Sequence, residues 1–92
     1  EAHYHLGLVM MRMGNYDKAE QNYRTALSIE GNLEPARGNL AVLLYRELNR
    51  PEEAFKHMQI YVANYPEGQL ENTFQTILSH RQYHGVVDLN HK

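Results

Sequence analysis

The six histidines are the residues of this sequence best suited to chemistry. His80 and His84 are four positions apart, so on a helix they project from the same face, as two ligands of one metal ion would. His3 and His5 are two positions apart and diverge on a helix. A zinc site needs three or four protein ligands, and no cysteine or glutamate-rich insertion completes the His80 and His84 pair. We therefore expect no metal ion and no other cofactor.

Candidate nucleophiles and acid pairs are equally unpromising. Ser28 and Ser79 lie in helical patterns and lack the sharp glycine-flanked turn that presents a hydrolase serine. No glycine-rich loop that could hold a phosphate is present. Glu52 and Glu53 suit the positive end of a helix dipole, because a catalytic carboxylate pair would require burial that these polar surroundings do not offer. The sequence predicts a protein that is not an enzyme.

Length, composition and charge predict one small globular domain and exclude some classes of partner. The 92 residues suffice for one small domain, and 42% hydrophobic with 22% charged residues is ordinary for a globular protein. The net charge is -2 and neither sign forms a run, which argues against nucleic-acid binding. No apolar stretch approaches the roughly 20 residues of a membrane span, and no signal peptide is recognisable. The absence of cysteine excludes disulfide bonds, but it does not decide between the cytoplasm and the periplasm as the compartment of the protein.

An internal repeat organises the chain. Leu6-Gly7 returns as Leu40-Ala41 after 34 residues. Three later positions of the first copy return after 35 residues, so one extra residue lies in the second tight turn; the pairs are Ala19 and Ala54, Tyr23 and Met58, and Gly31 and Pro66. Such a period is typical of helical repeat proteins.

Apolar residues spaced three and four apart predict five amphipathic helices. Gly14-Asn15, Gly31-Asn32, Asn49-Arg50 and residues 64–68 separate them, with Pro35 and Pro51 in first turns. Asn15 or Asp17 is available to cap the second helix. The predicted inward residues, helix by helix, are Leu6, Val9, Met10 and Met13; Tyr16, Ala19, Tyr23, Ala26, Leu27 and Ile29; Leu40, Leu43, Leu44 and Leu48; Ala54, Phe55, Met58, Tyr61 and Val62; and Leu70, Phe74, Ile77 and Leu78.

This pattern resembles the tetratricopeptide repeat family. The first copy of the motif is His3, Leu6-Gly7, Met10, Ala19, Tyr23 and Gly31, and the second is Arg37, Leu40-Ala41, Leu44, Ala54, Met58 and Pro66. The resemblance implies an all-α fold, a right-handed α-solenoid of two helix-turn-helix repeats (1–33 and 34–66) followed by a capping helix (67–85). We expect residues 86–92 to form a tail. Since the helical pattern is already present at Glu1, we also expect an excised domain or a processed product, from which flanking repeats can be missing.

Residue size explains the motif. Gly7, Ala19, Ala41 and Ala54 are small where the two helices of a pair cross closely, and Leu6, Leu40, Tyr23 and Met58 fill the space around them. His3 and Arg37 replace the family's large aromatic residue, and Tyr61 stands where Ala26 stands in the first copy, so we expect a wider second pair. At least three repeats are normally needed, so we expect low stability.

The resemblance also implies a concave groove, lined by the first helix of each pair, that binds a protein or peptide partner. Its lining positions here are Tyr4, Leu8, Met11, Arg12, Gly38, Asn39, Val42, Tyr45 and Arg46. The alternative is that Tyr4, Leu8 and Met11 pack against a missing preceding repeat or simply cover the hairpin. In the chaperone-binding subclass a lysine and an asparagine occupy the places of Tyr4 and Leu8; Asn39 alone matches that subclass, so we do not predict chaperone binding.

The resulting hypothesis is a scaffold or adaptor module. One alternative is self-association, in which exposed terminal helices pair with another copy to form a homo-oligomer. Another is a regulatory fragment of a larger protein.

Overall fold

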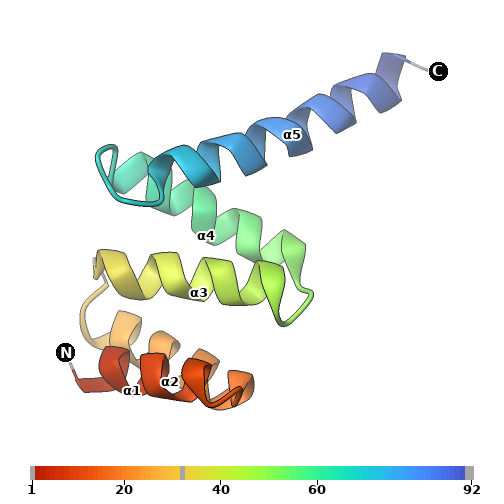
Figure 1. Cartoon of the computed structure of the whole chain (residues 1–92). Helices are drawn as coiled ribbons and strands as arrows, with labels where there is room; N and C mark the ends of the chain where they lie inside the picture. Colours follow the sequence, from red (N-terminus) through yellow and green to blue (C-terminus); the bar gives the residue numbers. More distant parts are fainter. Residues whose placement is uncertain (1, 32, 91–92) are drawn as a thin grey trace.

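Five helices joined by short turns make up the described part of the chain (Figure 1). The computed structural model describes residues 2–31 and 33–90, of which 82–90 are described by backbone only. The helices are α1 (Ala2–Arg12), α2 (Tyr16–Ile29), α3 (Glu34–Arg46), α4 (Pro51–Asn64) and α5 (Glu71–Asn90). The all-α fold expected from periodicity is therefore confirmed, and consecutive helices pack against each other as a helical repeat solenoid.

The turns show why the helices end where they do. Gly14 and Asn49 both have positive φ, 77° and 53°, and each reverses the chain between the two helices of a pair. Three residues separate α1 from α2 and four separate α3 from α4, which confirms the extra residue predicted in the second turn. Of the two candidate caps, the Asn15 side chain accepts a hydrogen bond from the Lys18 amide at 3.4 Å.

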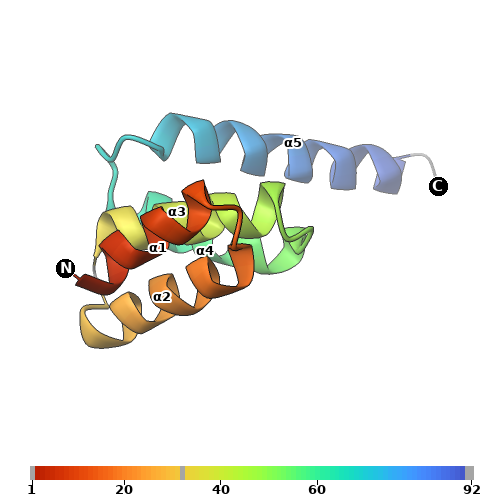
Figure 2. The ribbon, with the colours of Figure 1, turned by 60° about the horizontal axis from the view of Figure 1, so that its bottom comes forward.

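The helices form two layers. Helices α1, α3 and α5 form one layer and run in the same direction; we call this the first layer (Figures 1 and 2). Helices α2 and α4 form the other layer. The fully buried core lies between the layers, where α3 and α4 contribute most of it. Its large members are Tyr23, Leu40, Leu43, Leu44, Met58, Tyr61 and Phe74.

The inward stripe predicted for α1 is wrong in three places. Leu6, Val9 and Met13 are 47%, 46% and 70% exposed, and only Met10 of the four packs against the core. Leu40 and Leu43, one repeat later, are fully buried because α2 covers that face of α3. In the described structure no helix precedes α1, so the same face stays exposed. Ile29 at the end of α2 is also exposed, at 62%.

Helix α5 differs from the prediction at both ends. It begins at Glu71, four residues after the predicted start, and continues through 86–90, so the boundary between helix and tail predicted at residue 85 is wrong. Its buried positions repeat those of α3 at a spacing of 34, since Phe74 and Leu78 correspond to Leu40 and Leu44. By this pattern α5 has the packing of the first helix of a third repeat.

Candidate functional site

The four small residues expected at helix crossings are all buried. Ala19, Ala41 and Ala54 have no exposed surface, and Gly7 is the buried residue of α1. Gly7 packs directly against the ring of Tyr23. Close approach of the two helices in each pair therefore accompanies small residues at these positions.

Gly38 does not line the groove that the resemblance assigns it to. It is buried, and a Cβ atom there would lie 2.8 Å from Leu70 Cδ1 and 3.1 Å from Tyr61 Cε2. The Tyr61 hydroxyl donates to the Glu34 carboxylate and accepts a hydrogen bond from the Leu70 amide at 3.2 Å. Glycine at 38 thus allows Tyr61 and the segment before α5 to close over the start of α3.

Of the residues predicted to line the groove, those on α3 other than Gly38 share one cavity, which lies between α3 and α5. Asn39, Val42, Tyr45 and Arg46 line one side of a cavity of about 330 Å³. The remaining lining residues come from α4, α5 and the loop between them: Met58, Leu70, Thr73, Phe74 and Ile77. The cavity is therefore mostly apolar, with an amide and a guanidinium on its α3 side.

A second hollow of about 440 Å³ adjoins the first and shares Tyr45 and Ile77 with it. Phe55, Thr76, His80 and Arg81 complete its lining. The rings of Tyr45 and Phe55 are 5.9 Å apart, and the Arg81 guanidinium lies 4.7 Å from the centre of the Phe55 ring. Arg81 also contacts Glu52 at 3.1 Å, so it is held against α4.

The groove residues predicted on α1 lie outside both hollows. Tyr4 is partly buried, with its ring 6.1 Å from that of Tyr23, and its hydroxyl accepts a hydrogen bond from the Asn39 amide at 3.4 Å. Leu8 and Met11 are half-buried and Arg12 is exposed. Tyr4 and Met11 pack against the core, as the alternative hypothesis expects, in which these residues cover the first hairpin.

Sequence reasoning missed the contribution of α5 to this site. Treating α5 as a cap left out Thr73 and Ile77 of that helix and Leu70 in the loop before it, all of which line the first cavity. The signal that was available is the 34-residue spacing, which continues from Leu40 to Phe74 and thus makes α5 another first-layer helix.

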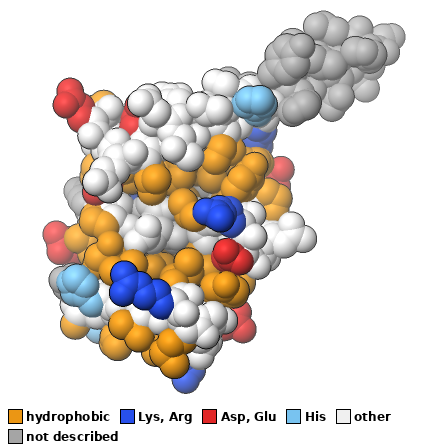
Figure 3. Space-filling view, viewed as in Figure 1, with side chains coloured by type: hydrophobic (Ala, Val, Ile, Leu, Met, Phe, Trp, Pro, Cys, Tyr) orange, Lys and Arg blue, Asp and Glu red, His pale blue; other side chains and the backbone are white. Residues whose placement is uncertain are grey.

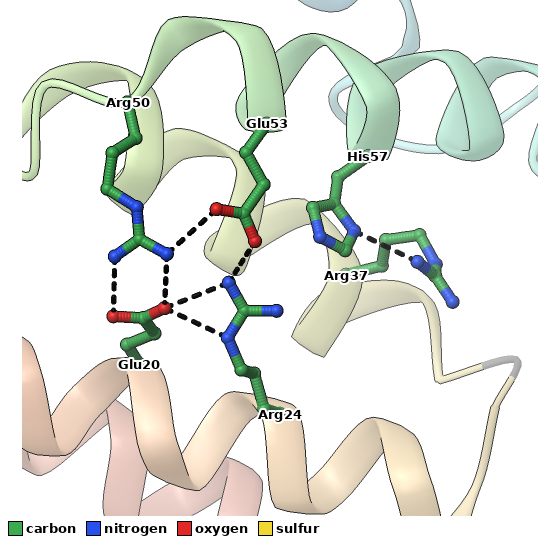
Figure 4. Close-up of polar contacts among 6 residues, drawn as sticks. All are labelled: Glu20, Arg24, Arg37, Arg50, Glu53 and His57. Atoms are coloured by element: carbon green, nitrogen blue, oxygen red, sulfur yellow. Dashed lines mark hydrogen bonds and ion pairs between the residues drawn. The ribbon is translucent and has the colours of Figure 1, made fainter.

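On the opposite side of the molecule, a charged network joins α2 to α4 (Figure 4). Arg50 contacts Glu20 at 2.9 Å and Glu53 at 2.7 Å, and Arg24 pairs with the same two carboxylates. Burial alone would raise the pKa of Glu20, but hydrogen bonds from Arg50 and Arg24 outweigh it and lower that pKa. Hydrogen bonds from the same arginines lower the pKa of Glu53. Arg24, Arg50 and Glu53 remain partly exposed to solvent, which screens their charges, so each pair of the network contributes only modestly to stability.

His57 lies beside this network and faces α3 (Figure 4). Its Nδ1 atom is 3.0 Å from Arg37 Nη1 and must accept that hydrogen bond, because a guanidinium can only donate. Burial, followed by the charges of Arg37 and Arg24, lowers the pKa of His57, with Glu53 acting weakly in the opposite sense. The arrangement favours a neutral imidazole that links α4 to α3.

The histidine pair considered above cannot be assembled from the described side chains. His80 lines the second hollow, and His84 lies outside the described side chains. Among the described residues no cluster of three or more histidine, cysteine, aspartate or glutamate side chains is placed to hold a metal ion. Within the same residues, no helix has both the length and the apolar character that crossing a bilayer requires.

Comparison with protein families agrees with the repeat seen in sequence and structure. Tetratricopeptide repeat models match residues 1–33, which contain α1 and α2, and residues 39–68, which contain most of α3 and all of α4. Searches of curated proteins and of solved structures find no match. With two family matches on two stacked helical hairpins, the chain belongs to the tetratricopeptide repeat family.

Proposed function

We propose that this chain is a protein-binding module that holds a segment of a partner protein in the cavity between α3 and α5. Tetratricopeptide repeats are in general protein-interaction modules and are typically non-catalytic. The observation that carries the finer proposal is the apolar cavity of about 330 Å³, into which Asn39, Val42, Tyr45 and Arg46 converge with side chains of α5.

The chemistry of this surface suits recognition. Figure 3 shows hydrophobic side chains across the face formed by the first-layer helices, interrupted by basic side chains and by an acidic one. Tyr45 is 39% exposed at the junction of the two hollows, and aromatic residues of this kind provide large contact area at low entropic cost. Burying it against a ligand would remove apolar surface from water and leave its hydroxyl free to hydrogen-bond at the rim.

Peptide display against the immobilised domain, followed by calorimetric titration of the selected peptides, tests this function. We expect Tyr45→Ala to weaken binding about tenfold, and Met11→Ala to weaken it less, because Met11 lies outside the cavity. Ile60→Ala is the matched control, since Ile60 is 40% exposed on α4 and lines neither hollow. Equal affinity of wild-type and folded Tyr45→Ala protein would show that the groove is not the binding surface.

A second candidate, self-association, is favoured by one observation. Leu6 and Val9 of α1 form an exposed apolar face together with Met13, which follows the helix. The residues of α3 equivalent to Leu6 and Val9 are buried, because α2 packs against that face of α3. A second copy that covered this face would remove apolar surface from water. Sedimentation over a concentration series tests it: Leu6→Glu should abolish any dimer, whereas Ile60→Glu should not, and a monomer at every concentration excludes it.

A further inference from the structure

Basic residues recur on the first-layer helices at the period of the repeat. Arg12, Arg46 and His80 are spaced 34 residues apart. Arg12 and Arg46 are the last residues of α1 and α3, whereas His80 lies in the middle of α5. Since α1 and α3 run in the same direction, Arg12 and Arg46 lie toward the same end of the first layer (Figure 1). All three side chains are exposed.

Acidic residues are scarce on these helices. Helix α1 has none, α3 has only Glu34, and the part of α5 up to Arg81 has only Glu71. Both glutamates are in first turns, at the opposite end from Arg12 and Arg46, and Glu34 accepts the hydrogen bond of Tyr61. Glu47 caps α3 directly after Arg46, and Arg37 lies near the start of α3. Up to Arg81, only the acidic residues within the first-layer helices themselves are therefore confined to the N-terminal ends of those helices.

The arginines of the protein differ in whether a carboxylate pairs with them. Arg81 is held by Glu52 and by the ring of Phe55. Arg24 and Arg50, which project from the other side of the molecule, share Glu20 and Glu53. Arg12 and Arg46 form no ion pair with any of the described side chains, and Arg46 lines the apolar cavity. A cation in the last turn of a helix is stabilised by the helix dipole, but that effect does not require it to border a cavity.

We infer that the ligand of this groove is an acidic peptide segment, in which carboxylates flank a large apolar side chain. This inference rests on the proposed function. The apolar side chain enters the cavity beside Val42, Tyr45 and Ile77, and the carboxylates face Arg46 and Arg12. Guanidinium groups bind carboxylates with two parallel hydrogen bonds, so these arginines would set both the affinity and the register of the peptide.

Fluorescence anisotropy with three labelled peptides tests this assignment. The acidic probe has Phe and Leu flanked by Glu and Asp; the neutral probe has Gln and Asn in place of the acids; the third probe keeps the acids but has Ala in place of Phe and Leu. We expect the acidic probe to bind about tenfold more tightly than either of the others, and its affinity to fall as salt is raised.

The double variant Arg12→Gln/Arg46→Gln should lose about tenfold in affinity for the acidic probe and should bind the neutral probe like wild type. Lys18→Gln/Lys56→Gln is the matched control, because it removes the same charge from exposed positions on α2 and α4. A melting curve of each variant checks that the fold is retained.

The outcomes separate the two proposals. Equal binding of acidic and neutral probes, or equal weakening by the lysine control, overturns the acidic preference. If Tyr45→Ala still weakens both probes in that case, the groove itself stands. If the acidic probe binds but Tyr45→Ala leaves its affinity unchanged, the groove is overturned. Tight binding of the probe without apolar residues shows attraction of any polyanion and also overturns the assignment.

Discussion

The ring of Tyr23 fills the space where a side chain at residue 7 would begin. A Cβ atom built on Gly7 lies 2.5 Å from Tyr23 Cε1 and 2.7 Å from Cδ1. The Tyr23 side chain is fully buried, and burial raises the pKa of its hydroxyl to about 12. Because the ring is enclosed, it cannot move aside without disturbing its neighbours.

We therefore expect Gly7→Ala to destabilise the protein. Overpacking of a core typically lowers the free energy of unfolding by about 1–3 kcal/mol. The better helix propensity of alanine returns about 1 kcal/mol. The expected net loss, measured by urea denaturation, is therefore up to about 2 kcal/mol. Gly31→Ala, where the nearest contact would be 3.8 Å away, should change stability by less than about 0.5 kcal/mol.

A double-mutant cycle tests whether the contact with Tyr23 causes the destabilisation by Gly7→Ala. In a Tyr23→Leu background the distal ring atoms are gone, so Gly7→Ala should become neutral or stabilising. If the cost of Gly7→Ala is the same in both backgrounds, the contact with Tyr23 is not its origin.

The Tyr61 hydroxyl leads to a second prediction. It donates to the Glu34 carboxylate and accepts from the Leu70 amide, so it links α3, α4 and the approach to α5. Tyr61→Phe should lower the free energy of unfolding by about 1–2 kcal/mol, since the partly buried Leu70 amide loses its hydrogen-bond partner. Tyr65→Phe is the control, because the buried Tyr65 hydroxyl has no hydrogen-bond partner among the described groups. A larger loss for Tyr65→Phe than for Tyr61→Phe would contradict this assignment.

Much of the fold could be predicted from sequence because local residue types determine the turns. Gly14 and Asn49 provide the left-handed backbone that ends a helix, and Pro51 begins the next one. Gly85 misled the prediction of the end of α5, because glycine weakens a helix interior by about 1 kcal/mol without forbidding it. The backbone of α5 accordingly continues to Asn90.

Exposure and the site were harder to predict. Periodicity identifies the apolar face of α1, but whether Leu6 is covered depends on a neighbouring helix that periodicity does not describe. The α3 half of the groove was predicted by position in the repeat, whereas the α5 half was not, because a capping helix is expected to be polar outside. The cavity beside Tyr45 depends on where α5 lies against α3, which is a tertiary property.

His57 makes stability depend on pH. Its pKa is lowered in the folded protein, so below the ordinary value of 6.5 the unfolded chain takes up a proton that the folded protein resists. Stability is therefore fully present above pH 6.5 and falls as the pH drops toward the lowered pKa. His57→Gln should flatten this dependence in denaturation curves recorded at a series of pH values.

The carboxylates of Glu20 and Glu53 affect stability in a separate pH range. The lowered pKa values of Glu20 and Glu53 affect stability only as the pH falls below their ordinary value of 4.5. An unchanged slope just below pH 6.5 in the His57→Gln protein would assign that slope to other groups.

Leu6 and Leu40 occupy equivalent repeat positions but have different surroundings, so the same substitution should have different effects. Leu40 is fully buried, and Leu40→Ala should cost about 2–5 kcal/mol of unfolding free energy. Leu6 is about half exposed, so Leu6→Ala should cost less than about 1 kcal/mol. Urea denaturation at several protein concentrations measures both. Equal costs would mean that the α1 face is covered in solution, and a cost for Leu6→Ala that disappears on dilution would identify a second copy as its cover.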